Sequence, residues 1–136
     1  MFAAALKKYR NLLFFGAAGV LGYFVDLSVT LCLELLVGPY LARVPAFLCA
    51  STATWIFNRG VTFRHQKAQK GVVAEWIHYI SLMAIGLIVN YCVYSMAISF
   101  MSRSVLSTSI AVALGSLAGM VINFSTSSKF LYKKSK

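Results

Sequence analysis

The feature that most constrains this chain is a succession of long apolar runs that contain few charged side chains. A helix that crosses about 30 Å of hydrocarbon needs roughly 20 such residues. We expect helices at residues 12–37, 41–57, 75–101 and 105–128, of which the second is the shortest. Every backbone N–H and C=O inside lipid needs a partner within the protein, so helices are the expected spanning element. The alternating pattern of a membrane barrel is absent.

The composition leaves little room for a soluble catalytic domain. Of the 136 residues, 60% are apolar and 12% are charged, whereas a soluble domain is about half apolar and a quarter charged. The longest hydrophilic stretch runs only from Asn58 to about Ala74. We therefore predict an all-α membrane protein with four transmembrane helices in a single domain over residues 1–136, and not an enzyme.

The Lys and Arg residues are distributed unevenly between the apolar runs. Three precede the first run, four lie in the central loop at 58–74 and four lie at the C-terminal end, whereas the opposite ends of the runs hold only Arg43 and Arg103. Cytoplasmic segments of membrane proteins carry such an excess of positive charge. We therefore predict that both termini and the central loop are cytoplasmic. Cations placed between apolar runs do not form the exposed basic face that nucleic-acid binding requires.

The two halves of the chain share a pattern that indicates an internal repeat. Residues 22–26 read Gly-Tyr-Phe-Val-Asp and residues 86–90 read Gly-Leu-Ile-Val-Asn, at an offset of 64. Small or polar residues recur at every fourth position of the second and fourth runs, ending at Asn58 and Asn123. Such faces let helices pack closely. We infer a duplicated helical hairpin, and because each hairpin begins and ends inside, the two are parallel repeats.

Polar side chains inside the apolar runs are the candidate binding residues. Asp26 lies near the middle of the first run, where a carboxylate costs on the order of 2.5–3.5 kcal/mol on insertion scales. Such a residue usually faces the bundle interior or a wet cavity. Asp26 is therefore either a site residue or a structural carboxyl that is hydrogen-bonded to a neighbour such as Asn90. Glu34 lies nearer the outer interface, where solvation is easier.

A second group of candidates lies at the cytoplasmic boundary. Asn58 and Asn123 end the second and fourth runs, Arg59 follows the first of them and Lys129 lies shortly after the second. The guanidinium of arginine binds phosphate with two hydrogen bonds. The other interpretation is that these cations only orient the helices and contact lipid phosphates. No cysteine pair or histidine cluster has metal-ligand spacing, so no metal or cofactor is predicted.

These boundary residues resemble those of the GtrA-like family. Residues 58–63 read Asn-Arg-Gly-Val-Thr-Phe, similar to the Asn-Arg-x-Trp-Thr-Phe typical of that family, with Val61 in place of the tryptophan. Its second half typically closes with Asn-Phe, a basic residue and aromatics. Here residues 123–124 read Asn-Phe and residues 129–132 read Lys-Phe-Leu-Tyr. The resemblance extends over nearly the whole chain.

The resemblance implies a bacterial inner-membrane protein of cell-surface polysaccharide synthesis. Family members are proposed to flip a polyprenyl-phosphate-linked sugar, such as an undecaprenyl-phosphate monosaccharide, from the inner to the outer leaflet. A membrane glycosyltransferase would then use the sugar. Membrane lipids are expected neighbours, and a homodimer with the site between protomers is a further hypothesis. The expected substrate contacts are Arg59, Asn58, Asp26, Asn90, Asn123 and Lys129.

Two other functions stay open. The chain would serve as a non-transporting partner that binds and stabilises a polyprenyl-phosphate glycosyltransferase in the membrane. It would otherwise be a small proton-coupled exporter, a class that shares four helices and an acid in the first. The Asn58-Arg59 motif and the long basic central loop argue against the exporter.

Overall fold

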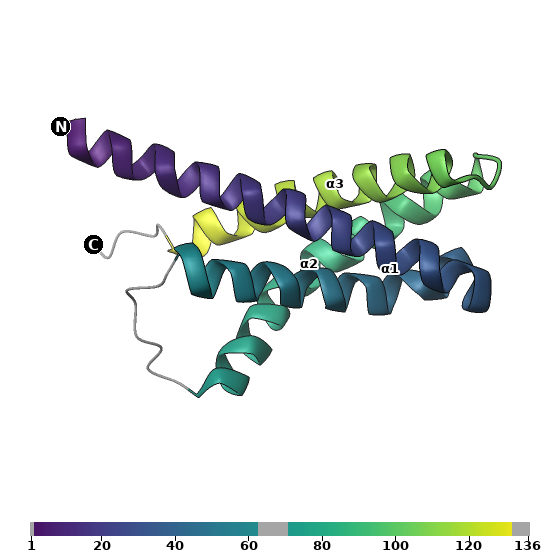
Figure 1. Ribbon diagram of the computed structural model, residues 1–136, viewed down its shortest axis with the longest axis horizontal. Coiled ribbons are helices and arrows are strands. Elements are labelled where there is room, and N and C mark those ends of the chain that lie inside the picture. Colours follow the sequence, from purple (N-terminus) through teal and green to yellow (C-terminus); the bar gives the residue numbers. More distant parts are fainter. Residues whose placement is uncertain (1, 63–70, 132–136) are drawn as a thin grey trace.

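The computed structural model describes the backbone of residues 2–62 and 71–131, and the side chains of residues 9, 10, 13, 14, 16–61 and 71–123. Within these residues it contains helices and short turns but no strand, which confirms the predicted all-α class. In chain order the elements are the helix α1 (Phe2–Phe57), the π-helix η1 (Asn58–Thr62), α2 (Val72–Ser99) and α3 (Val105–Leu131) (Figure 1).

The long helix α1 is folded back on itself at Gly38. This glycine has φ 82° and ψ 166°, a backbone conformation that residues with a Cβ rarely adopt. Pro39 follows and has no backbone N–H to continue the preceding helix. The bend separates a first arm (residues 2–37) from a second arm (residues 39–57), and the two arms run side by side in opposite directions (Figure 1).

The described chain contains three helices that are long and apolar enough to cross a membrane, at Gly16–Val61, Val72–Ser99 and Val105–Asn123. The protein is therefore a multi-pass membrane protein. The first helix covers 46 residues, whereas one crossing needs about 20, and it includes the bend at Gly38. The expected spans at 12–37 and 41–57 correspond to its two arms, and a separate crossing by each arm stays a prediction.

The observed helices extend beyond some of the expected bounds. α1 begins at Phe2 instead of residue 12, α2 begins at Val72 instead of residue 75, and α3 continues to Leu131. Each residue added to an existing helix gains a backbone hydrogen bond, so a helix need not end where its apolar run ends. The central loop is accordingly shorter than the expected 58–74, because η1 and the start of α2 lie within that range.

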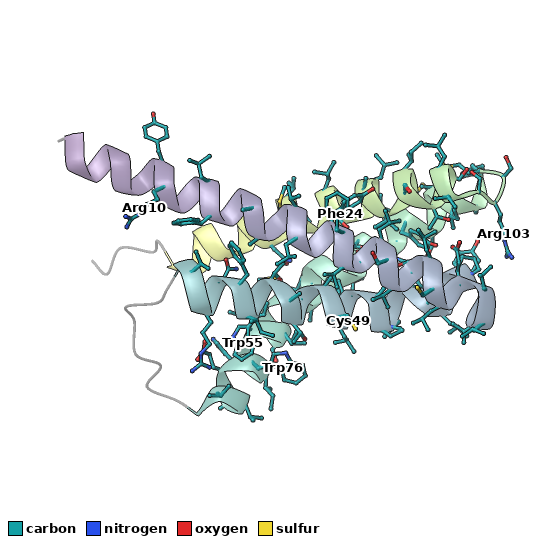
Figure 2. All side chains as sticks on the ribbon, in the orientation of Figure 1. Arg10, Phe24, Cys49, Trp55, Trp76 and Arg103 are labelled. Atoms are coloured by element: carbon teal, nitrogen blue, oxygen red, sulfur yellow. The ribbon has the colours of Figure 1, made fainter. Side chains whose placement is uncertain are left out.

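The outward surface of the bundle consists largely of apolar side chains. Leu35, Phe100 and Ile88 are 87%, 86% and 64% exposed in the isolated chain, and Phe24 in α1, labelled in Figure 2, is 60% exposed. A water-soluble monomer rarely exposes so continuous an apolar face. Lipid chains solvate such a surface well, in agreement with a membrane location.

Small residues bring α2 and α3 into backbone contact. A Cβ placed on Gly119 would lie 2.7 Å from the carbonyl oxygen of Gly86. In the other half of the chain, a Cβ on Gly22 would lie 2.7 Å from Cγ2 of Thr54. Gly22 and Gly86 are 64 residues apart and Thr54 and Gly119 are 65 apart, so the two contacts occupy equivalent positions of the repeat. The predicted packing through small residues is therefore observed in both halves.

We predict that Gly119→Ala destabilises the bundle, whereas Gly16→Ala does not. The new methyl group at 119 would overlap the Gly86 carbonyl, and overpacking costs about 1–3 kcal/mol. Gly16 has no atom within 4 Å of its ideal Cβ, so alanine there gains about 0.5–1 kcal/mol of helix propensity. Thermal unfolding in detergent micelles, followed by circular dichroism, measures both. Equal stability of the two variants would contradict the close contact of α2 with α3.

Candidate functional site

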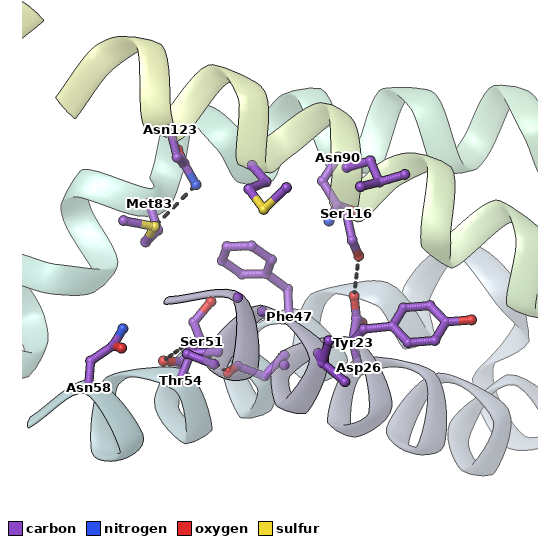
Figure 3. A pocket seen from close by; sticks show the side chains of 18 of the residues that line it. Tyr23, Asp26, Phe47, Ser51, Thr54, Asn58, Met83, Asn90, Ser116 and Asn123 are labelled. Carbon is purple, nitrogen blue, oxygen red and sulfur yellow. Dashed lines mark hydrogen bonds between the residues drawn. The ribbon is translucent and has the colours of Figure 1, made fainter. Parts of the chain in front are cut away.

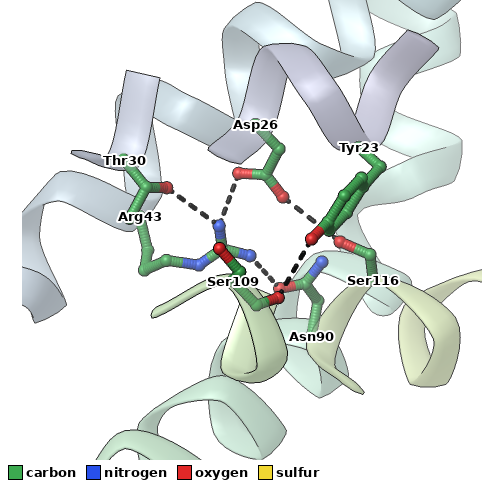
Figure 4. A network of polar contacts seen from close by, with 7 residues as sticks. All are labelled: Tyr23, Asp26, Thr30, Arg43, Asn90, Ser109 and Ser116. Atoms are coloured by element: carbon green, nitrogen blue, oxygen red, sulfur yellow. Dashed lines mark hydrogen bonds and ion pairs between the residues drawn. The ribbon is translucent and has the colours of Figure 1, made fainter. Parts of the chain in front are cut away.

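A buried arginine lies at the centre of a polar cluster between the helices (Figure 4). The side chain of Arg43 in the second arm is 1% exposed. Its Nη1 donates to Oδ1 of Asp26 at 2.5 Å and to Oγ1 of Thr30 at 3.1 Å, and its Nη2 donates to Oδ1 of Asn90 at 2.5 Å. Its Cζ lies 4.5 Å from the centre of the Tyr94 ring. A charge this deeply buried requires such partners, because its desolvation would otherwise cost several kcal/mol.

The same cluster connects both arms of α1 to α2 and α3. Asp26, in the first arm, is 3% exposed, and its second oxygen Oδ2 accepts a hydrogen bond from Oγ of Ser116 in α3 at 3.3 Å. Asn90 comes from α2. Nearby, Oη of Tyr23 donates to the backbone oxygen of Ser109 in α3 at 3.1 Å (Figure 4). One ion pair and its neutral partners therefore join all the long helical segments.

A pocket of about 550 Å³ lies beside this cluster, between α1 and the α2–α3 hairpin (Figure 3). Asn58 and Asn123 lie at one end of it, and Asp26 and Asn90 lie at the other. The remaining lining residues are apolar or glycine: Gly16, Ala18, Gly19, Val20, Gly22, Phe47, Ala50, Met83, Ala113, Leu117 and Met120. Its polar lining residues are Tyr23, Asp26, Ser51, Thr54, Asn58, Tyr79, Asn90, Ser116 and Asn123.

The structure brings four of the six expected contact residues to this pocket, namely Asp26, Asn58, Asn90 and Asn123. Among the described residues, the side-chain amide of Asn123 makes one weak hydrogen bond. Its Nδ2 donates to Sδ of Met83 at 3.1 Å, a poor acceptor, and its buried Oδ1 has no hydrogen-bond partner among the described residues. Buried amides normally satisfy these groups, so Asn123 has donor and acceptor capacity left for a ligand.

The two expected phosphate contacts are placed differently. Arg59 does not line the pocket. Its Nη1 lies 3.2 Å from Oε2 of Glu75, and its Cζ lies 5.5 Å from the centre of the Trp55 ring. The side chain of Lys129 lies outside the described residues. The role of these two residues as phosphate contacts stays a prediction.

The arginine at the centre of the cluster was missed by the sequence interpretation. The charge distribution groups Arg43 with Arg103 as the cations of the outer turns, but Arg43 is buried and reaches Asp26. It also lies between Asp26 and Asn90, so the hydrogen bond expected between those two is replaced by one from Arg43 to each. The available signal was an arginine inside one apolar run that follows an acid inside the previous run, since intramembrane charges usually pair.

Glu34, the acid of the first arm nearest the bend, lies outside the pocket lining. Its Oε2 accepts a hydrogen bond from Oγ1 of Thr108 in α3 at 3.2 Å.

The described residues contain no group of three or more histidine, cysteine, aspartate or glutamate side chains that would hold a metal ion.

A model of a known family matches the chain. The family is described as GtrA/DPMS, transmembrane domain, and the match covers residues 14–132. That range includes the bend at Gly38, the buried cluster and all the residues that line the pocket. No curated protein and no solved structure matches the chain.

We predict strong energetic coupling between Arg43 and Asp26. Arg43→Gln leaves the buried carboxylate without its counter-charge, and breaking one side of a buried pair costs about 3–5 kcal/mol. The double variant Arg43→Gln/Asp26→Asn removes both charges, so its loss of stability is smaller than the sum of the two single losses. Thermal unfolding of the four proteins in micelles measures the coupling.

The ion pair between Arg59 and Glu75 provides the matched comparison. Its side chains are 37% and 32% exposed, and exposed pairs contribute only about 0–1 kcal/mol. Arg59→Gln should therefore change the melting temperature little. Additive losses for Arg43 and Asp26, or a larger loss for Arg59→Gln, would contradict the central position of the buried pair.

Proposed function

Because the chain belongs to the GtrA/DPMS transmembrane-domain family, we propose that it moves a polyprenyl-phosphate-linked monosaccharide across the bacterial inner membrane. Membership associates the chain with membrane proteins of polyprenyl-phosphate sugars, which are generally non-catalytic. The translocated sugar would be used outside by a membrane glycosyltransferase in cell-surface polysaccharide synthesis. The pocket between α1 and the α2–α3 hairpin is the observation that carries this proposal.

The physical problem for such a carrier is the head of the lipid and not its tail. A phosphodiester and a sugar lose their hydration when they enter hydrocarbon, which is unfavourable unless the protein replaces the lost hydrogen bonds. The polyprenyl tail stays in the bilayer throughout. A pocket of about 550 Å³ falls within the 300–1,000 Å³ typical of small-molecule sites, and its few polar groups lie among apolar ones.

In the proposed mechanism the two asparagines at the cytoplasmic end of the pocket hold the sugar. Asn58 and Asn123 each offer amide donors and acceptors for hydroxyl groups. Arg59 and Lys129 attract the phosphate at the cytoplasmic boundary. Release of Arg59 from Glu75 is inexpensive, because this pair is about one-third exposed and such pairs contribute little.

The buried Arg43 holds the residues at the opposite end of the pocket. Asp26 and Asn90 form that end, and both are bonded to the buried Arg43. Among the lining residues of the first arm, Asp26 is the nearest to the Gly38 bend. We propose that this is the inward-facing state, and that the cluster must rearrange before the head reaches the outer leaflet.

A reconstituted transport assay tests the proposal. Proteoliposomes would contain the purified protein and a fluorescent polyprenyl-phosphate monosaccharide, and a membrane-impermeant quencher would report its movement between leaflets. We expect rapid transfer by the wild type. Asn123→Ala should slow transfer about tenfold, since a lost hydrogen bond of about 1.4 kcal/mol corresponds to that factor.

Ser81→Ala is the matched control, because Ser81 is exposed and its Oγ donates only to the backbone oxygen of Ile77 within its own helix. This variant should transfer the lipid at the wild-type rate. Absence of transfer by the wild type, together with copurification of a polyprenyl-phosphate glycosyltransferase, would instead support the role of a non-transporting partner. Export of organic cations that depends on Asp26 would support the small exporter.

The proposal also requires that both arms of α1 cross the membrane. The start of α1 and the end of α3 lie at one end of the bundle, and the Gly38 bend and the α2–α3 turn lie at the other (Figure 1). Arg10 lies toward the first end and Arg103 toward the second (Figure 2). The excess of cations in the terminal segments and the central loop predicts that the first end is cytoplasmic.

We predict that alkaline phosphatase is inactive when fused to the C-terminus and active when inserted beside Arg103, because the enzyme folds only outside the cytoplasm. A green fluorescent protein fused to either terminus should fluoresce. Activity of the C-terminal phosphatase fusion would contradict the orientation. Inactivity of a phosphatase inserted at the Gly38 bend would contradict a separate crossing by each arm of α1.

A further inference from the structure

Resting on the proposed function, we infer that Arg43 is the group that binds the phosphate of the lipid head inside the pocket. In this inference Asp26 is the resting counter-ion of Arg43, and the phosphate takes its place. The assignment differs from that of Arg59 and Lys129, which lie at the boundary and attract the phosphate before it enters.

The first reason is the position of the available cations. A buried phosphate needs a positive partner. The described side chains include four cations, Arg10, Arg43, Arg59 and Arg103, and none of them lines the pocket. Arg10 and Arg103 are exposed and Arg59 is paired with Glu75. Arg43 lies directly behind the pocket wall, bonded to two of its lining residues.

The second reason is that the hydrogen-bonding capacity of Arg43 is not exhausted. A guanidinium has five N–H donors, and the Nε of Arg43 is buried without a hydrogen-bond partner among the described residues. A buried, unpaired donor is unfavourable. Phosphate oxygens accept from arginine in pairs, in the fork geometry that a guanidinium presents. An arriving phosphate would therefore find both a charge and a free donor.

The third reason is the way in which the carboxylate is held. Oδ1 of Asp26 binds Arg43, whereas its other oxygen, Oδ2, accepts from Ser116. Loss of the contact with Arg43 therefore leaves Asp26 with its hydrogen bond to α3. The phosphate diester carries one negative charge, as Asp26 does, so Arg43 has one anionic partner before and after the exchange. Because phosphate and carboxylate compete for one cation, removal of the carboxylate charge should favour the phosphate.

This competition gives opposite expectations for the two members of the pair. The experiment measures binding of farnesyl methyl phosphate, a prenyl phosphodiester without sugar, to the full-length protein in detergent micelles. Arg43→Gln should weaken binding by at least about tenfold, as expected for loss of a charge-assisted hydrogen bond. Asp26→Asn should tighten binding several-fold. Arg10→Gln is the matched control, an exposed arginine whose loss should leave the affinity unchanged.

A purely structural ion pair predicts that both variants bind more weakly, so weaker or unchanged binding by Asp26→Asn overturns the inference. If Arg43→Gln does not fold, the uncharged double variant Arg43→Gln/Asp26→Asn replaces it, and wild-type affinity in that protein overturns the inference. A parallel titration with inorganic phosphate identifies the source of the ligand. Equal affinity for inorganic phosphate overturns the assignment to a lipid head, and weak affinity supports it.

The binding and transport measurements fail separately. If the wild type transfers the lipid-linked sugar but Asp26→Asn does not bind the diester more tightly, the inference about Arg43 is wrong and the proposed function stands. If the wild type binds the diester with the expected pattern but transfers no lipid, the proposed transport is wrong and the phosphate site stands. If the wild type binds no diester, the inference is wrong.

Discussion

The arrangement of the helices depends on the burial of one positive charge in a bundle that is otherwise apolar. Arg43 is 1% exposed, and an unpaired cation at that depth would be strongly destabilising. Its partners come from different segments: Asp26 from the first arm and Asn90 from α2, while Ser116 of α3 binds Asp26. Hydrophobic packing alone is tolerant of register within lipid. The requirement that these polar atoms meet restricts how far each helix slides past its neighbours.

The pocket exists because the small residues of the chain do not all serve the same purpose. On α3, Gly119 is so close to α2 that a methyl group would meet the Gly86 carbonyl. On the first arm, Gly16 and Gly19 have nothing within 4 Å of an ideal Cβ, and both line the pocket. Helices α2 and α3 are therefore tightly packed against each other. The first arm, in contrast, is separated from them by the pocket at Gly16 and Gly19. Equivalent patterns of small residues thus produce close packing in one place and a cavity in another.

The sequence predicts the helical class, the bend after residue 37 and four of the nine polar residues that line the pocket, because these follow from local properties. Glycine and proline break a helix, and polar side chains inside apolar runs have few stable positions other than the interior. Arg43 could not be placed in the same way. It was grouped with the cations of the outer side by counting cations by segment. Its position depends instead on a long side chain that crosses from the second arm to Asp26 and Thr30 of the first arm. The extension of α1 to Phe2 was not expected, because Lys7, Lys8 and Arg10 interrupt the apolar sequence before residue 12.

The buried pair also determines what opening the pocket would require. Separation of Arg43 from Asp26 inside hydrocarbon would expose two unpaired charges, and each carries a desolvation penalty of several kcal/mol. In the proposed mechanism the guanidinium is never left unpaired, because the arriving phosphate supplies a second anion for it. Asp26 retains Ser116 as a partner during the exchange. The end of the pocket that Arg43 holds would therefore stay in place in the absence of substrate and become movable once a phosphate is bound. In such a carrier the coupling between substrate binding and opening comes from the substrate's own charge.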